Sequence, residues 1–185
     1  LIYGNGINGN GTKDGKANGL HFVNCTFSNP GTGNENNDES NHIQIRNYKN
    51  VTMNNCICNG IPLIPISQSA VLITDVENFT ASNCGFEDYN SNMVYQTGST
   101  NIKFVNCNFK SSYTSTICTT TTSLVKFINC TFTRGGSIKG RVDFNNCEFI
   151  NSTELTILGV LGVGYLVKFS NCIFDHSTLS SMATR

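Results

Sequence analysis

Charged residues are scarce in this sequence, and long apolar runs are missing. Only 13% of the 185 residues are charged, and 12 basic residues balance 12 acidic ones, so there is no basic stripe to bind nucleic acid. The longest apolar stretch, Leu155–Val167, is interrupted by glycines and is too short to span a membrane. Tryptophan is absent as well. We therefore expect neither a nucleic-acid partner nor a membrane span.

Residue groupings typical of enzymes are also missing. A glycosidase needs two carboxylates about 5–9 Å apart on a rigid surface, whereas the predicted strand faces carry isolated acids such as Asp143. The three histidines, His21, His42 and His176, are scattered and form no Ser/His/Asp grouping. We predict no catalytic residues from these patterns, and no cofactor.

The sequence does contain a short motif, best seen at Ile102–Phe109, which occurs seven times. Apolar residues stand five and three positions before a Cys, with Asn immediately before it. Two positions after the Cys comes Phe in six copies and Cys58 in the other. The seven aligned cysteines are Cys25, Cys56, Cys84, Cys107, Cys130, Cys147 and Cys172. The preceding asparagines are Asn24, Asn55, Asn83, Asn106, Asn129, Asn146 and Asn171.

The motif predicts two short strands joined by a sharp bend. Apolar residues alternate on either side of the Asn, as in half-buried strands, and the Asn changes which residues point inward. Asn is the non-glycine residue that best tolerates the left-handed conformation of such a bend. A third strand precedes each motif, for example at His42–Arg46, Ala70–Thr74, Asn92–Gln96 and Thr116–Thr119.

Three strands and three turns per repeat predict a single-stranded parallel β-helix of about seven to eight coils. Cys and Phe would stack inside from coil to coil, and the asparagines would form an external ladder. We predict one domain over residues 1–185, with an incomplete first coil at 1–19, seven repeats at 20–175 and a C-terminal tail at 176–185. Because the chain opens at Leu1 without Met, we expect it to be a segment of a longer protein.

The nine cysteines are predicted to be free thiols. Parallel side chains on successive coils lack the approach geometry of a disulfide. Cys56 and Cys58 would both point inward, with no His nearby in sequence, so we predict no metal site. A ladder of free thiols favours an anaerobic or otherwise reducing source.

Five threonines, Thr116 and Thr119–Thr122, fall close together. Regular outward ranks of Thr on a β-helix can bind ice, but such ranks need Thr at one coil position over many coils. We interpret these threonines as part of one loop, which excludes that function.

The repeat resembles the pectate-lyase-like right-handed parallel β-helix superfamily, in particular its carbohydrate-binding and sugar-hydrolase repeats. Those repeats read apolar-x-apolar-x-Asn-Asn-x-apolar, and here Cys replaces the second Asn over residues 20–175. The superfamily includes lyases, hydrolases, phage tailspikes, adhesins and inert spacers. The Asn-rich, Trp-free coils look most like adhesin-like surface proteins or phage and viral tail fibres.

The resemblance also implies a place for a site, because sugars commonly bind along one strand face of these proteins. The acidic insertion Ser28–Ser40, with Glu35, Asp38 and Glu39, leads directly into the third strand of the next coil. The candidate glycan-binding residues on that face are His42, Gln44, Arg46 and, two coils on, Tyr95. If the protein is an enzyme, the candidates are Glu35, Asp38 and Arg46.

Two functions stay open at this point. The first is a non-enzymatic structural or adhesion β-helix of a cell-surface, fibre or tail protein, located outside the cell or on a virion, with glycans as its expected ligands. The second is a polysaccharide lyase or glycoside hydrolase. No capping helix is apparent at either end, and an uncapped solenoid exposes strand edges. We therefore expect a neighbouring domain or like subunits, as a trimer or an end-to-end fibre.

Overall fold

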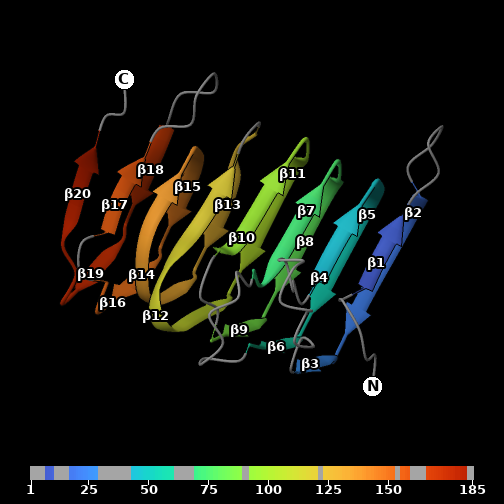
Figure 1. Cartoon of the computed structure of the whole chain (residues 1–185), viewed down its shortest axis with the longest axis horizontal. Helices are drawn as coiled ribbons and strands as arrows, with labels where there is room; N and C mark the ends of the chain where they lie inside the picture. The colour runs from blue at the N-terminus through green and yellow to red at the C-terminus, as the bar shows by residue number, and fades with distance from the viewer. Residues whose placement is uncertain are drawn as a thin grey trace, which may run out of the picture.

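The chain forms a rod of short parallel strands, described here from a computed structural model (Figure 1). The structure describes residues 7–10, 17–28, 43–60, 69–88, 92–120, 123–152, 155–158 and 166–182. Within these ranges every strand pairing is parallel, and each strand pairs with the equivalent strand one repeat away. The predicted all-β parallel β-helix is confirmed.

The strands fall into three columns that run along the rod. The first column, before the Asn-Cys bend, contains β2 (Ala17–Val23), β5 (Tyr48–Asn54), β8 (Glu77–Ser82), β11 (Thr100–Val105), β13 (Val125–Ile128), β15 (Arg141–Asn145) and β18 (Leu166–Ser170). The second, after the bend, contains β3 (Thr26–Ser28), β6 (Ile57–Asn59), β9 (Gly85–Glu87), the starts of β12 (Asn108–Thr120) and β14 (Thr131–Lys139), β16 (Glu148–Ile150) and β19 (Ile173–Asp175). The third contains β1 (Ile7–Asn10), β4 (Ile43–Arg46), β7 (Val71–Thr74), β10 (Asn92–Thr97), the ends of β12 and β14, β17 (Leu155–Leu158) and β20 (Leu179–Met182).

Two long strands join the second and third columns. β12 and β14 continue from one column into the next, so these columns form one 13-stranded sheet beside the 7-stranded first column. The threonines at 116 and 119–120 therefore lie in strand β12, and their interpretation as part of a loop is wrong. The C-terminal tail expected at 176–185 includes β20, which pairs with β17 and extends the third column.

The asparagine before each aligned Cys forms the predicted bend. All seven have left-handed backbone conformations, with φ between 52° and 55°. Their side chains form the predicted external ladder: Asn106 donates to Asn83 Oδ1 at 3.2 Å, and Asn129 donates to Asn106 Oδ1 at 3.2 Å. At the third repeat the ladder shifts by one residue, because Asn83 donates to Asn54 Oδ1 at 3.4 Å.

A second asparagine ladder, which the repeat analysis missed, runs along the start of the first column. Asn50 donates to Asn18 at 2.8 Å, Asn78 to Asn50 at 2.9 Å and Asn101 to Asn78 at 2.8 Å. Asn50, Asn78 and Asn101 also have left-handed backbones. This second ladder stabilises a second bend in the N-terminal half of the rod.

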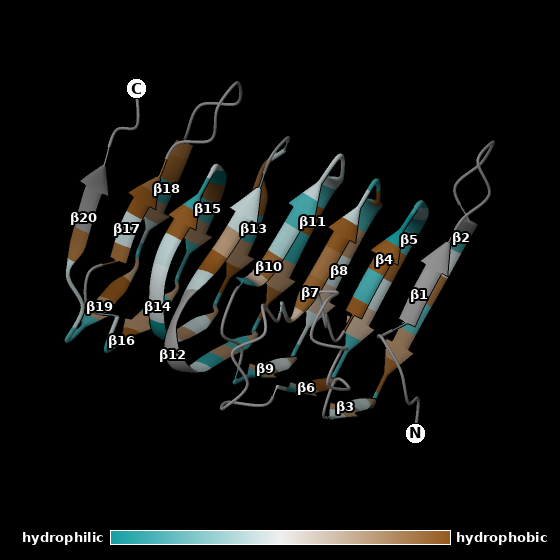
Figure 2. Ribbon diagram, viewed as in Figure 1, coloured by the Kyte–Doolittle hydropathy of each residue, from teal (hydrophilic) through white to brown (hydrophobic). Residues whose placement is uncertain are grey.

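Two rows of phenylalanine fill the interior. Phe104, Phe127, Phe144 and Phe169 stack face to face from coil to coil, with ring centroids 5.1–5.2 Å apart. A second row comprises Phe86, Phe109, Phe132, Phe149 and Phe174, with centroids 4.9–5.1 Å apart. The two rows meet edge to face, as in the pair Phe127 and Phe132. Figure 2 shows the alternation of hydrophobic and hydrophilic residues along the strands that this packing requires.

Replacing one ladder asparagine tests how much the bend contributes to stability. Asn106→Ala removes two side-chain hydrogen bonds and puts a Cβ-bearing residue without a local partner into a left-handed backbone. We expect the free energy of unfolding in urea to fall by about 2 kcal/mol. Asn106→Gly should recover about half of this loss because glycine tolerates the backbone conformation.

The matched control is Asn108→Ala. Asn108 is exposed in the neighbouring strand β12 and does not have a left-handed backbone. Its replacement should change the unfolding free energy by about 0.5 kcal/mol or less. Equal losses for Asn106→Ala and Asn108→Ala would contradict the role given to the bend.

Candidate functional site

The candidate glycan-binding residues that the structure describes lie on the outer face of the third column. Gln44 and Arg46 are in β4 and Tyr95 is in β10. Gln44 pairs in register with Leu72, which pairs with Tyr95, so Gln44 and Tyr95 share one coil position two rungs apart. Two rungs correspond to about 10 Å along the rod. His42, Glu35 and Asp38 lie outside the described residues.

The side chain of Arg46 is hydrogen-bonded to Gln44, two residues earlier in the same strand. With the Gln44 amide oriented to accept, its oxygen takes hydrogen bonds from both Nε of Arg46, at 2.8 Å, and a terminal nitrogen of the same guanidinium. Arg46 is exposed and Gln44 half-buried, so the pair presents remaining N–H donors to solvent. A guanidinium in this arrangement suits the recognition of hydroxyl or carboxylate oxygens.

Tyr95 provides the aromatic ring on this face. It is half-buried between the neighbouring rungs, beside Leu72 on one side and Thr119 on the other. Leu72 is 7% exposed and provides an apolar neighbour. A tyrosine in such a place combines a flat apolar surface with a polar hydroxyl, which suits a ligand that is itself part apolar and part polar.

Hydroxyl groups continue the face toward the C-terminal end. Thr116, Ser137 and Thr156 occupy one coil position on three successive rungs. Thr116 and Ser137 are joined by a hydrogen bond of 2.9 Å, and Thr119 donates to Asn92 Oδ1 at 2.8 Å. The repeat motif could not locate this row, because the pairing of β12 with β14 changes register three times between Lys110 and Cys118.

In the described strands, each carboxylate pairs in register with residues that are not acidic. Lys49 and Glu77 form an exposed ion pair at 3.5 Å, and Glu87 lies opposite Lys110. Asp143 lies between Lys126 and Lys168 on adjacent rungs. No register pair in the described strands puts two carboxylates directly opposite each other.

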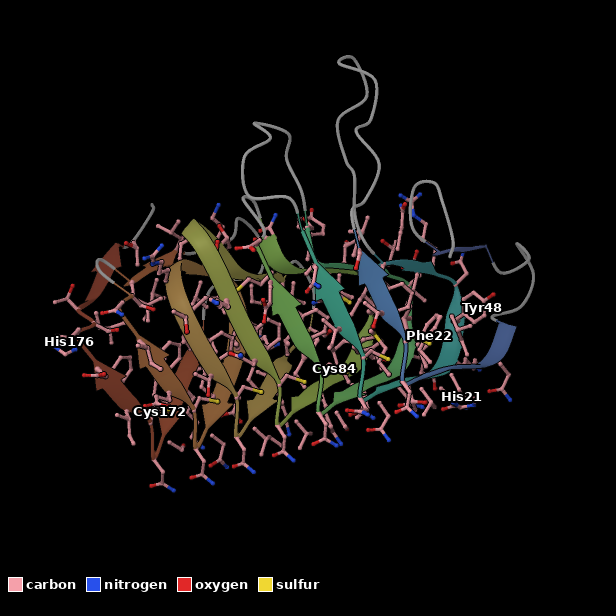
Figure 3. The ribbon with its side chains drawn as sticks, turned by 90° about the horizontal axis from the view of Figure 1, so that it is seen from below. His21, Phe22, Tyr48, Cys84, Cys172 and His176 are labelled. Atoms are coloured by element: carbon pink, nitrogen blue, oxygen red, sulfur yellow. The ribbon has the colours of Figure 1, made fainter. Side chains whose placement is uncertain are left out.

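The histidines do not gather into a site either. His21 in β2 bonds Thr52 at 2.7 Å, and His176 after β19 contacts Asp175 at 2.8 Å. These two histidines lie at opposite ends of the rod (Figure 3). The described part of the chain contains no group of three His, Cys, Asp or Glu side chains that could hold a metal ion.

The cysteine row is a structural element of the interior. All nine cysteines are free, and the aligned thiols donate to the carbonyl two residues earlier at 3.2–3.5 Å, as Cys84 does to Ser82. Successive thiols also contact each other, so the predicted stacking of Cys107 on Cys130 is confirmed. Sulfur atoms follow one another along the rod in Figure 3.

Burial controls the chemistry of these thiols. It raises the pKa of Cys58 and of Cys118 well above the ordinary cysteine value. Within the row, hydrogen bonds with neighbouring thiols raise the pKa of Cys130 and lower the pKa of Cys107 and Cys147. Cys107 and Cys147 are only 2% and 1% exposed, so reagents in solvent cannot reach them.

These observations define a β-helix, and the comparison with protein families identifies which kind. The family model described as "Right handed beta helix region" matches residues 69–183. The chain therefore belongs to the right-handed β-helix family, and the predicted right-handed fold is confirmed. A comparison with curated proteins found no match. In the described ranges there is no helix long and apolar enough to cross a membrane.

Thiol labelling tests the burial of the row. A thiol reagent added to the native protein should modify Cys25 and Cys172, which are half-buried at the two ends of the row. The other seven, which are buried, should react only after denaturant is added. Mass spectrometry of the labelled peptides would identify the modified positions, and rapid native labelling of Cys107 would contradict the packing described.

The raised thiol pKa values also predict how stability depends on pH. Unfolded cysteine ionises near pH 9.0, whereas the buried Cys118 thiol stays neutral above that pH. The unfolded state therefore loses protons first, and stability should fall from about pH 9 upward by about 1.4 kcal/mol per pH unit for each such thiol. Urea unfolding at several pH values should show a shallower fall for Cys118→Ala than for the unmodified chain.

Proposed function

We propose that this chain is a non-enzymatic β-helix segment of a cell-surface, fibre or tail protein that binds glycans along its third column. The observation that carries the proposal is the face shared by Gln44 and Tyr95. There, the aromatic ring of Tyr95 in β10 and the hydrogen-bonded Gln44–Arg46 pair in β4 lie two rungs apart on one sheet, with β7 between them. Sites built on strands hold their geometry better than sites on loops.

The shape and charge of this face favour an extended, neutral or weakly acidic polysaccharide. The face is long and straight because its strands follow one another along the rod (Figure 1). It offers hydroxyls, an amide, one guanidinium and one phenol ring, which are groups that bind sugar hydroxyls and stack on sugar rings. We infer that the glycan lies parallel to the rod axis and crosses several rungs.

The proposal includes a location outside the cell or on a virion, where polysaccharides are met. The free thiols support an anaerobic or otherwise reducing source, because in oxidising surroundings the half-buried thiols of Cys25 and Cys172 at the row's ends would be oxidised.

A polysaccharide lyase or hydrolase is the second candidate. It is supported by Arg46, which is exposed on this face and follows the acidic insertion in sequence. A lyase needs a free group that removes a proton, whereas the Arg46 guanidinium is engaged in two hydrogen bonds to Gln44. The geometry therefore favours binding over cleavage.

Titration calorimetry with a panel of neutral and uronic-acid oligosaccharides tests the binding. We expect at least one to bind, and Tyr95→Ala to weaken its affinity by about tenfold through loss of the ring contact. Tyr95→Phe should retain most of the affinity. The control Lys103→Ala, which changes the first column instead, should bind as the unmodified chain does.

The same mixtures report on catalysis. If new reducing ends or unsaturated uronates appear, and are absent with Arg46→Ala, the chain is an enzyme and not only a glycan-binding protein. Unchanged affinity in Tyr95→Ala, or no binding across the panel, would contradict the assignment of this face.

A further inference from the structure

Four aligned thiols form an unbroken row in the middle of the rod. Cys84, Cys107, Cys130 and Cys147 follow one another on four successive rungs, and each is at most 2% exposed. Hydrogen bonds join Cys84 to Cys107, Cys107 to Cys130 and Cys130 to Cys147. Further rungs lie on both sides of these four (Figure 3), so their burial does not depend on where the chain begins or ends.

The spacing of these four thiols suits a metal ion that takes only two ligands. Neighbouring strands of a sheet are about 4.8 Å apart and side chains stand roughly perpendicular to the sheet, so successive sulfur atoms face each other along the rod. A bond between a thiolate and a metal ion is about 2.3 Å long, so an ion midway between two sulfurs holds them about 4.6 Å apart. The described residues contain no group of three metal ligands, but a linear site needs only a pair.

The chemistry of the row selects a soft ion with a single positive charge. Thiolate sulfur prefers soft ions such as Cu(I). Each Cu(I) ion can take the place of one thiol proton, so the interior stays neutral and no charge is buried without a partner. Zn²⁺ carries a second charge and takes four ligands in structural sites, which these gaps do not offer.

The thiol protons can leave without depriving the backbone of its hydrogen bonds. Cys107 donates to Val105 O at 3.4 Å, but this carbonyl also accepts from Asn83 N–H at 3.0 Å. The carbonyls that accept from Cys84, Cys130 and Cys147 likewise accept from a ladder asparagine N–H of the preceding rung, at 2.9–3.0 Å. The cost of replacing the protons is therefore confined to weak S–H donors.

We propose that the three gaps between these four thiols bind Cu(I), with one ion in each gap held in linear coordination by the two sulfur atoms that face it. The inner sulfurs, of Cys107 and Cys130, each bridge two ions, and the outer sulfurs, of Cys84 and Cys147, each bind one. Three ions enter and three protons leave, while the fourth proton stays on an outer sulfur. Copper does not change its oxidation state.

The hydrogen bonds within the row favour this exchange. Those with Cys130 and Cys84 lower the pKa of Cys107, so the thiol that bridges two ions is also one that readily gives up its proton. Because the four thiols are buried in the folded rod, the ions enter while the coils assemble, and binding is coupled to folding.

Refolding in the presence of Cu(I) tests the proposal. The chain is unfolded in urea, refolded with Cu(I) in the absence of oxygen and freed of loose metal by gel filtration. We expect three copper ions per chain by atomic absorption, a native circular dichroism spectrum and two sulfur neighbours per copper by X-ray absorption. Zn²⁺ offered in the same way should not be retained by these thiols.

Replacing single cysteines should remove ions in a pattern that only shared sulfurs produce. Cys107→Ala opens two gaps and should leave one ion, whereas Cys84→Ala opens one gap and should leave two. Cys130→Ala should also leave one ion, and it replaces Cys107→Ala in the test if that variant does not fold. The matched control is Cys118→Ala, because Cys118 is 0% exposed but lies at a different coil position. It should keep all three ions.

Two results would overturn the proposal. A refolded chain with native circular dichroism and no copper would show that the gaps do not bind the ion. Loss of one ion from each variant, Cys118→Ala included, would show that single thiols bind copper independently of the row.

Discussion

The whole rod depends on one repeated backbone bend, in which an asparagine takes a left-handed conformation between two short strands. The bend makes apolar residues on both sides point to the same interior, so one turn of chain can enclose Val, Phe, Cys and Phe together. It also sets the next strand in line with the strand of the preceding coil. Parallel hydrogen bonds, aromatic stacking and the amide ladder all follow from that alignment.

Inside the rod, a small side chain at one inward position is compensated by a large one at another position of the same rung. Where the inward position three residues before the Cys is the small Ala81, the position two residues earlier is the large Phe79, and the ring of Phe79 contacts Phe104 in the next rung. Volume is thus kept nearly constant although the residues change places. The coil with Cys58 in place of phenylalanine has Met53, a side chain that adapts to irregular space.

Sequence reasoning could predict those features that recur at a fixed distance from the Cys. Three features recur in this way: the strands, the bends at residues such as Asn106, and the interior rows. Each of them depends on only a few neighbouring residues in the sequence. The second ladder escaped prediction because the equivalent position is Arg141 or Leu166 in later repeats. The candidate face was predictable as far as the alignment of Gln44 with Tyr95. The Gln44–Arg46 bond and the hydroxyl row required side-chain positions and strand bulges that no repeat count contains.

The hydrogen bonds between rungs run nearly parallel to the long axis of the rod. A force that pulls the two ends apart therefore loads one rung's bonds at a time instead of shearing many together. Each coil touches only its neighbours, so the molecule would peel open coil by coil from whichever end gives way first. Pulled in this way, the rod would yield gradually and lengthen instead of breaking in one step.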